Sequence, residues 1–186
     1  MKLNKIELEK KNIYWDYVHT PKGYEVAKDV LKSSALHYFF IDQKRLSEDK
    51  FENRYYDFKI DYTKEVDYFL TLIRERFTLT HNRALVLNKS WSNCFYPMES
   101  SIKRNNLNIG NLAESPDYSM IYAIDVGLDS CDLVIEYETN RKYILNWRIP
   151  MDTNKFVIFP SGLNYYITKN KSDKMNIFFG GTYSEL

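Results

Sequence analysis

Residues 85–95 read LVLNKSWSNCF, and this stretch indicates the fold class more directly than any other part of the chain. Apolar and polar side chains alternate along it, which is the period-two pattern of a strand with two different faces. We expect Leu85, Leu87, Trp91 and Phe95 to lie on one face, and Cys94 to lie on the other. The stretch therefore predicts a long strand at the beginning of a β-rich half.

Further strands are expected after this one, because short apolar runs recur between turn-forming residues at spacings of about 8 to 12 residues. These runs occupy residues 118–126, 133–138, 143–149, 156–159, 163–168 and 175–179. About seven strands at such a spacing indicate a sandwich or a barrel.

Two amphipathic helices are expected before the strands, over residues 24–34 and 64–77. The second is the stronger prediction, because Thr63 can cap it with its hydroxyl and apolar side chains recur at helical spacing. Its apolar face consists of Val66, Phe69, Leu70, Ile73 and Phe77. Because a helix must bury such a face, we expect the helices to pack on one sheet.

Composition argues against several classes of protein. The 186-residue chain carries 26 basic and 25 acidic side chains, and a net charge of +1 gives no sign of a nucleic-acid-binding surface. No run approaches 18 apolar residues, so no segment is expected to span a membrane. Cys94 and Cys131 are far apart and form no Cys-x-x-Cys motif, which favours a reducing, intracellular setting.

Four stretches of the β-rich half form an ordered set. They are WSNCFY at 91–96, YSMIYAI at 118–124, FVIFPSGL at 156–163 and KMNIFF at 174–179. Together they resemble the 2-oxoglutarate/iron(II) oxygenase superfamily, in particular its small members in marine bacteria and tailed phages. The resemblance implies a mainly β (α+β) fold, a double-stranded β-helix or jelly roll with two flanking helices. We expect one domain over residues 1–186, in which residues 1–82 supply an N-terminal strand and the helices and residues 83–186 supply the core strands.

The chemistry of that family requires an iron site that this sequence does not supply. The facial triad consists of two histidines and one carboxylate, and in the family its first two ligands form His-x-Asp or His-x-His. The three histidines of this chain are His19, His37 and His81, and none of them begins such a motif. We therefore expect no metal and no cofactor.

The resemblance assigns other residues to the positions of the missing site. They are Arg104 and Asn106, or the neighbours Lys103 and Asn105, for the proximal ligands, Tyr165 for the distal histidine, and Lys174 for the 2-oxoglutarate-binding arginine. Cationic side chains repel iron, an amide is a weak neutral ligand, and a protonated phenol is a poor one. These positions therefore predict a vestigial site rather than a catalytic one.

Other groups of residues have simpler interpretations than a functional site. Asp125, Asp129 and Asp132 lack the ligand order of an EF-hand, and Cys94 lies within a strand, where a buried inert thiol is more common than a nucleophile. Strand aromatics can line a sugar or aromatic-ligand pocket, but they more often fill a barrel core. The aromatic candidates are Tyr137, Tyr143, Trp147, Tyr165 and Tyr166.

Residues 100–116 interrupt the strand pattern with Asn and Ser, and they predict a long loop. Long loops on rigid scaffolds often carry function, so we expect contacts with other proteins through Lys103, Arg104, Asn105 and Asn108. The simplest interpretation of the basic pair Lys103 and Arg104 is a solvated part of this loop, and the alternatives are salt bridges with Glu99 or Glu114 or an anion site.

The sequence thus favours a non-catalytic, oxygenase-like protein with a structural or interaction role, such as a component of a phage virion or of its assembly. The alternative is an oxygenase or a small-ligand-binding enzyme with unconventional site residues. Expected partners are other protein chains, in a homo-oligomer or a larger assembly, with no nucleic acid and no membrane. The expected location is the cytoplasm of the host cell, or the virion if a phage encodes the chain.

Overall fold

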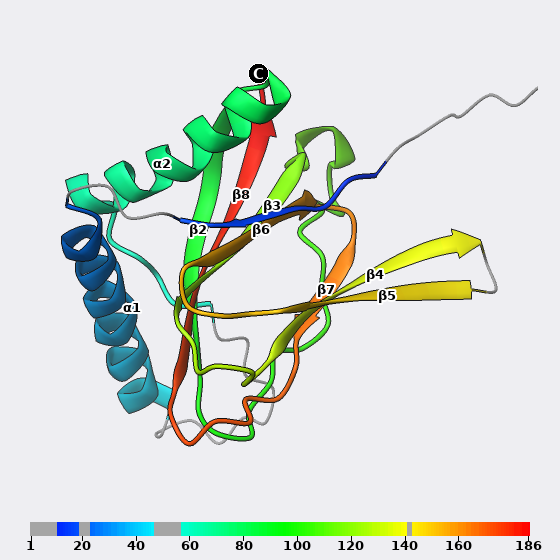
Figure 1. Cartoon of the computed structure of the whole chain (residues 1–186). Coiled ribbons are helices and arrows are strands. Elements are labelled where there is room, and N and C mark those ends of the chain that lie inside the picture. The colour runs from blue at the N-terminus through cyan, green and yellow to red at the C-terminus, as the bar shows by residue number, and fades with distance from the viewer. Residues whose placement is uncertain (1–10, 19–22, 47–56, 141–142) are drawn as a thin grey trace, which may run out of the picture.

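The computed structural model describes residues 11–18, 23–46, 57–140 and 143–186. A first strand, β1 (Tyr14–Tyr17), precedes two helices, α1 (Tyr24–Leu46) and α2 (Lys64–His81) (Figure 1). The other strands are β2 (Leu85–Phe95), β3 (Tyr118–Asp125), β4 (Asp132–Asn140), β5 (Tyr143–Pro150), β6 (Lys155–Pro160), β7 (Asn164–Ile167) and β8 (Asn176–Glu185). A short 3-10 helix (Leu112–Glu114) lies between β2 and β3.

The strands form two antiparallel sheets with the order of a double-stranded β-helix. The larger sheet has the order β1-β6-β3-β8-β2, and the smaller sheet has the order β5-β4-β7. After β3 the chain enters the smaller sheet with β4 and β5, returns with β6, and crosses again to β7 and back to β8. This winding encloses a core between the sheets, so the predicted jelly roll with two flanking helices is confirmed.

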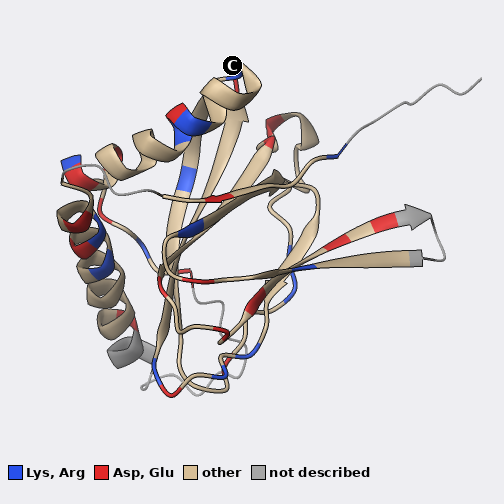
Figure 2. Cartoon of the chain, viewed as in Figure 1, with Lys and Arg blue, Asp and Glu red and all other residues tan. Residues whose placement is uncertain are grey.

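Two apolar cores lie between the three layers of the fold, which are the helices, the larger sheet and the smaller sheet. The helices cover the outer face of the larger sheet (Figure 1), where Leu31 and Phe69 pack with strand residues such as Met120. The second core lies between the two sheets and includes Phe159 and Phe178. Charges of both signs are interspersed along the helices and strands in the view of Figure 2.

The faces predicted for β2 are wrong in the first part of the strand, because it contains a β-bulge. Leu85 and Leu87 pack on the helix side, whereas Trp91 and Phe95 pack between the sheets. The register with β8 shifts between Leu87 and Lys89. An extra residue on one strand moves the following side chains to the opposite face, so a period-two count fails across it.

The last strand, β8, continues beyond residue 179, where the sequence predicts its end. A Cβ atom at Gly180 would lie 2.2 Å from Cε2 of Trp91, so only glycine fits at this position. The missing side chain allows the indole of Trp91 to lie against the backbone of β8. Gly180 therefore lets a large aromatic residue occupy the centre of the jelly roll.

The second helix begins where the sequence predicts it. The Thr63 hydroxyl accepts a hydrogen bond from the backbone N–H of Val66 at 3.3 Å, as expected of an N-cap. The first helix is longer than predicted, because Ala35 and Phe39 continue its buried face beyond residue 34. Among the described residues, neither helix is long and apolar enough to cross a membrane.

Candidate functional site

Three of the predicted vestigial positions meet where the loop after β2 runs beside β7. Arg104 and Tyr165 form an isolated antiparallel bridge. The backbone N–H of Arg104 donates to the Tyr165 carbonyl at 3.0 Å, and the N–H of Tyr165 donates to the Arg104 carbonyl at 2.7 Å. The backbone N–H of Asn106 donates to the Ser161 carbonyl at 3.1 Å. The structure thus brings Arg104, Asn106 and Tyr165 together.

The guanidinium of Arg104 is fixed by hydrogen bonds, by an ion pair and by aromatic rings. Its Nε donates to the Tyr165 hydroxyl at 2.9 Å, and its terminal nitrogen donates to Asp57 Oδ2 at 2.7 Å. Its central carbon lies 5.2 Å from the centroid of the Trp91 ring and 5.5 Å from that of Tyr165. A partly buried cation surrounded in this way has little freedom to move.

Asp57 is a site residue that the sequence analysis missed. Its Oδ1 accepts a hydrogen bond from Asn93 Nδ2 at 3.0 Å, and Asn93 Oδ1 accepts one from Trp91 Nε1 at 3.0 Å. The backbone of the next residue, Phe58, pairs with Ser92 of β2 in an isolated bridge, which carries Asp57 to the site. Asp57 lies in a charged, aromatic stretch without a clear period, so no local signal identifies it.

Asn106 extends the same hydrogen-bond network toward the larger sheet. Its Nδ2 donates to the Tyr165 hydroxyl at 3.2 Å and to Ser119 Oγ at 2.8 Å, and Ser119 Oγ lies 2.8 Å from Ser161 Oγ. Among the described residues, no buried side-chain nitrogen or oxygen lacks a hydrogen-bond partner. We call the following residues the central network: Asp57, Trp91, Asn93, Arg104, Asn106, Ser119, Ser161 and Tyr165.

Electrostatics keeps the two principal members of the central network in fixed protonation states. Burial lowers the pKa of Arg104, but the interactions with Asp57 and Tyr165 together outweigh burial, so the pKa is raised above its ordinary value. Burial raises the pKa of the Tyr165 phenol against the opposing effects of Arg104 and Asn106. Near neutral pH the network therefore contains a cation and a protonated phenol.

The donors of the central network do not fit iron(II). A facial triad needs two imidazoles and a carboxylate with open coordination positions. The network instead offers the guanidinium of Arg104, the phenol of Tyr165 and the amide of Asn106, and its carboxylate, Asp57, already binds Arg104. Nowhere in the part of the chain that the structure describes do three His, Cys, Asp or Glu side chains gather in a way that could hold a metal ion.

Lys174, the fourth predicted vestigial position, lies outside the central network. It is exposed in the turn before β8, where its carbonyl accepts hydrogen bonds from Asn170 Nδ2 at 2.6 Å and Ser172 Oγ at 2.9 Å. These bonds hold the turn on the surface and keep Lys174 out of the strand. The structure therefore places Lys174 apart from Arg104, Asn106 and Tyr165.

The salt-bridge partners considered for the basic pair of the loop differ from those in the structure. Lys103 Nζ lies 2.8 Å from Glu136 Oε2 on β4, while Arg104 binds Asp57. Neighbouring side chains of an extended segment point in opposite directions, so Lys103 faces outward when Arg104 faces the centre. Glu99 instead accepts a hydrogen bond from the backbone N–H of Tyr96 at 2.9 Å.

The histidines and cysteines have structural surroundings. His81 packs at the end of α2 with its ring centroid 4.1 Å from that of Tyr14, and His37 is exposed on α1. His19 lies outside the described residues. Burial raises the pKa of the Cys94 thiol to about 12 and that of Cys131 to about 11, so neither is activated as a nucleophile.

The acidic residues considered for calcium have protein partners instead. Asp125 forms an ion pair with Lys32 of α1, and Asp132 forms one with Arg148 of β5 at 3.3 Å. Two of the three carboxylates therefore have cationic side chains as partners and do not require a calcium ion to balance their charge.

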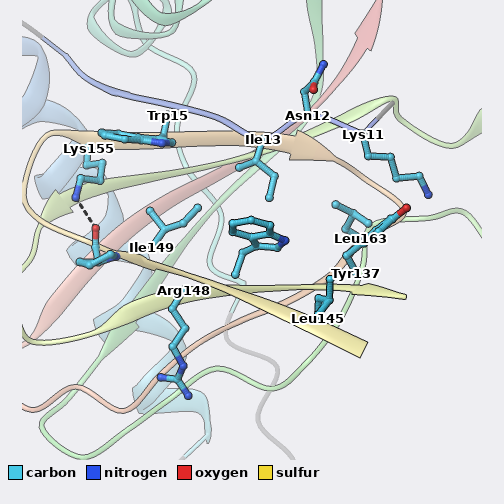
Figure 3. A pocket seen from close by; sticks show the side chains of 12 residues that line it. Lys11, Asn12, Ile13, Trp15, Tyr137, Leu145, Arg148, Ile149, Lys155 and Leu163 are labelled. Atoms are coloured by element: carbon cyan, nitrogen blue, oxygen red, sulfur yellow. Dashed lines mark hydrogen bonds between the residues drawn. The ribbon is translucent and has the colours of Figure 1, made fainter. Parts of the chain in front are cut away.

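An open groove on the side of the jelly roll contains part of the predicted aromatic pocket. It lies between β1 and β6 on one side and the β4–β5 hairpin on the other, and has a volume of about 730 Å³ (Figure 3). Tyr137 and Trp147 line it, together with Trp15 of β1. Tyr165 belongs to the central network, and the side chain of Tyr143 falls outside the described ones. We call this feature the edge groove.

The loop of residues 100–116 is anchored at its base and has an apolar tip. Asn105 Nδ2 donates to Asn164 Oδ1 at 3.0 Å, and Asn108 Oδ1 accepts a hydrogen bond from the backbone N–H of Gly110 at 3.2 Å. Ile109 and Leu112, by contrast, are 89% and 66% exposed. The predicted contact residues Asn105 and Asn108 therefore stabilise the loop, and the most exposed apolar side chains of the loop, Ile109 and Leu112, are not among the predicted contact residues.

Together these features define a class of fold: a double-stranded β-helix with helices on the outer face of its larger sheet and a hydrogen-bonded centre. This is the fold of the 2-oxoglutarate/iron(II) oxygenases. The chain is similar to AviO1 from Streptomyces viridochromogenes Tue57, with a TM-score of 0.60 and 12% identity over 94% of this chain and 90% of that one. A prolyl-4-hydroxylase from Pseudomonas putida gives a TM-score of 0.57 and 10% identity, with coverages of 94% and 92%.

A third structure shares a smaller part of the fold. It is an oxidoreductase of the 2OG-Fe(II) oxygenase family from Burkholderia pseudomallei, with a TM-score of 0.51 and 8% identity over 69% of this chain. The present chain spans 61% of the length of that protein. No protein-family model and no curated protein sequence matches the chain. At these identities the comparisons show the fold alone.

Proposed function

We propose that this chain is a non-catalytic jelly-roll protein that works by binding other proteins. One observation carries the proposal: the guanidinium of Arg104 stands where the resemblance expects an iron ligand, and Asp57 and Tyr165 hold it there. The positive charge of the guanidinium repels an Fe(II) ion at that position. The neighbouring phenol and amide carry no negative charge that would compensate for this repulsion. The scaffold of the oxygenases is thus kept while the groups that bind iron are replaced by a satisfied hydrogen-bond network.

An iron titration tests this proposal against a designed variant. We expect the wild-type protein to bind no Fe(II) in anaerobic calorimetry. The triple variant Arg104→His, Asn106→Asp, Tyr165→His restores the donor types of the facial triad and is expected to gain Fe(II) binding. Stoichiometric binding by the wild type would refute the proposal, and a folded triple variant without any gain would show that the assigned positions are wrong.

The apolar tip of the loop supports a role in protein contacts. Exposed apolar side chains at the tip of an anchored loop are suited to burial against another chain, and Ile109 is almost fully exposed. We propose that the tip contributes to a homo-oligomer or a larger assembly, such as a phage virion.

Sedimentation velocity at several concentrations tests the contact role. Ile109→Asp should reduce self-association or binding to an assembly partner, because it places a charge where apolar surface would be buried. Leu79→Asp is the matched control, since Leu79 is 88% exposed on α2, outside the loop. Equal effects of the two substitutions, or a wild-type chain that stays monomeric and joins no assembly, would refute this role.

The alternative is an oxygenase or a small-ligand-binding enzyme that uses unconventional groups. It is favoured by the similar structures, among which are a prolyl-4-hydroxylase and a carbocyclase described as α-ketoglutarate dependent. Succinate formed from 2-oxoglutarate in an iron-dependent reaction would favour this alternative.

A further inference from the structure

The β4–β5 hairpin extends beyond the strand that supports it. β7 pairs with β4 as far as Glu136, whereas β4 and β5 pair with each other as far as Asn140 and Tyr143. The outer half of the hairpin accordingly projects from the body of the molecule (Figure 1). Among the described strands, β5 pairs with β4 alone, so the hydrogen-bonding groups along its other side face no strand.

The other edges of the two sheets are protected. The loop after β2 covers β7 through the bridge between Arg104 and Tyr165, and Phe58 covers part of β2 through a second bridge. β1 is four residues long and carries the charged residue Asp16. Cover, short length and charge are the usual means of protecting an edge strand. β5, in contrast, has no charged residue and no proline between residues 144 and 147.

β5 also exposes apolar side chains on both of its faces. Leu145 and Trp147, which line the edge groove, are 48% and 58% exposed, and Ile144 on the opposite face is 55% exposed. A ligand in the edge groove would cover only the first two. A strand added to the edge covers both faces, because its own side chains alternate between them. The edge therefore favours a strand that itself carries apolar residues on both faces, and β5 is such a strand.

We infer that two copies of this chain pair through their β5 strands, antiparallel to each other and about a two-fold axis at Asn146. This register pairs residues 143–149 and leaves Pro150, which has no N–H, at the end of the paired segment. The two three-stranded sheets become one continuous sheet. The contact is isologous, so each copy offers and receives the same surface.

The register joins complementary side chains. Leu145 lies opposite Trp147 of the second copy on the face of the edge groove, and Ile144 lies opposite Arg148 on the other face. The amide of Asn146 meets its own copy at the axis, where each amide can donate and accept a hydrogen bond.

Charges also complement each other across this contact. Glu138 is exposed on β4, directly opposite Ile144 of β5. In the dimer Ile144 stands between Glu138 and Arg148 of the second copy, whose Cα atoms are two strand spacings, or about 10 Å, apart. Arg148 is 61% exposed despite its 3.3 Å ion pair with Asp132, so its long side chain can reach a second carboxylate. Within one copy Glu138 and Arg148 are four residue steps apart along the hairpin, or about 14 Å, so their pairing belongs to the dimer.

Closure of the sheet distinguishes a second copy from a strand of another protein. A strand of another protein would leave its own far edge open. When two β5 strands pair, the joined sheet ends in β7 on both sides, and the loop already covers β7. Self-pairing thus gives the joined sheet two covered edges.

This inference rests on the proposed function only in taking protein binding as the role of the chain, and it names a second copy as the partner. It uses no residue of the central network or of the loop tip. Iron binding by the wild type would therefore refute the proposed function without affecting the dimer, and absence of the β5 contact would leave the result of the iron titration unchanged.

Cysteine cross-linking of the full chain tests the register. Asn146→Cys places two thiols at the axis with Cα atoms about 4.5 to 5.5 Å apart, within the range of a disulfide, so mild oxidation should yield a covalent dimer. The matched control is Ile144→Cys on the same face, whose two copies lie about 14 Å apart and should not cross-link. The native thiols of Cys94 and Cys131 are buried and should not compete.

Sedimentation velocity tests the dimer without a new thiol. We expect the wild-type chain to dimerise as its concentration rises. Leu145→Lys should weaken the dimer about tenfold or more, because it places a charge where apolar surface is buried. Val86→Lys is the matched control, since Val86 is 42% exposed on β2, in the other sheet. Glu138→Arg should also weaken the dimer, and the addition of Arg148→Glu should recover most of the lost affinity.

Equal cross-linking of the two cysteine variants, a wild-type chain that stays monomeric, or a dimer that Leu145→Lys does not weaken would overturn the inference. Failure of the exchanged charges to recover affinity would overturn it as well. Self-association that Ile109→Asp removes and Leu145→Lys does not would overturn the β5 contact and leave the contact role of the loop standing.

Discussion

Replacement of Asp57 by asparagine isolates the charge that holds the centre of the jelly roll. Asp57→Asn keeps the size of the side chain but leaves the guanidinium of Arg104 without its counter-ion. Breaking a fully buried pair costs about 3 to 5 kcal/mol, whereas an exposed pair contributes about 0 to 1 kcal/mol. The side chains of Arg104 and Asp57 are 16% and 25% exposed, so we expect a loss of about 2 to 3 kcal/mol. For a chain of this length such a loss lowers Tm by roughly 5 to 10 °C.

Urea unfolding and calorimetry at pH 7 measure the effect in a double-mutant cycle. Arg104→Met should also destabilise the protein, because it leaves the carboxylate of Asp57 without its counter-ion. The combination with Asp57→Asn should cost less than the sum of the two substitutions, with a coupling of about 1 to 3 kcal/mol. Arg148→Met is the control, since its ion pair with Asp132 is exposed and its loss should cost less than about 1 kcal/mol. Additive substitutions, or a loss at Asp57→Asn no larger than at the control, would refute the structural role of the pair.

Three other perturbations test separate parts of the structure. Gly180→Ala should prevent folding or reduce Tm strongly, because the added Cβ would overlap the Trp91 ring. The control Gly110→Ala should be tolerated, because the nearest atom to its added Cβ is 3.5 Å away. Equal melting temperatures of the two variants would contradict this geometry. The Cys94 thiol, with its pKa raised to about 12, should react with a disulfide reagent at pH 8 only after unfolding, and rapid labelling of the native protein would show that it is accessible. Burial raises the pKa of Tyr165 above its ordinary value of 10.0, so the folded state keeps this proton longer and stability should fall as pH rises above about 10. Tyr165→Phe should make that fall shallower, and an unchanged slope in urea unfolding would contradict the assignment.

The sequence predicts the fold well because local patterns carry most of the information about strands and helices. The apolar stripe from Val66 to Phe77 and the cap at Thr63 give α2 its start and its buried face. Alternation and turn residues place every strand from β2 to β8. Local patterns do not predict features that depend on contacts between residues far apart in the sequence. Examples are the bulge after Leu87 and the continuation of β8 through Gly180.

The candidate site could be predicted only in part for the same reason. The order of motifs brings Arg104, Asn106 and Tyr165 to one place, since the bridge between the loop and β7 follows from the fold. Asp57 belongs to a separate segment of the sequence, and no pattern in the residues around it predicts an ion pair with Arg104. The prediction for Lys174 rests on its place at the start of the KMNIFF stretch, and the turn held by Asn170 keeps Lys174 outside the strand.

The most direct test of the account is iron-dependent turnover of 2-oxoglutarate by the purified wild-type protein. The protein is reconstituted anaerobically with Fe(II), its bound metal is measured, and succinate is then followed after oxygen is admitted. Because Arg104, Tyr165 and Asn106 replace the donors of the facial triad, we predict no bound iron and no succinate above the level without protein. Stoichiometric iron together with protein-dependent succinate would contradict the account.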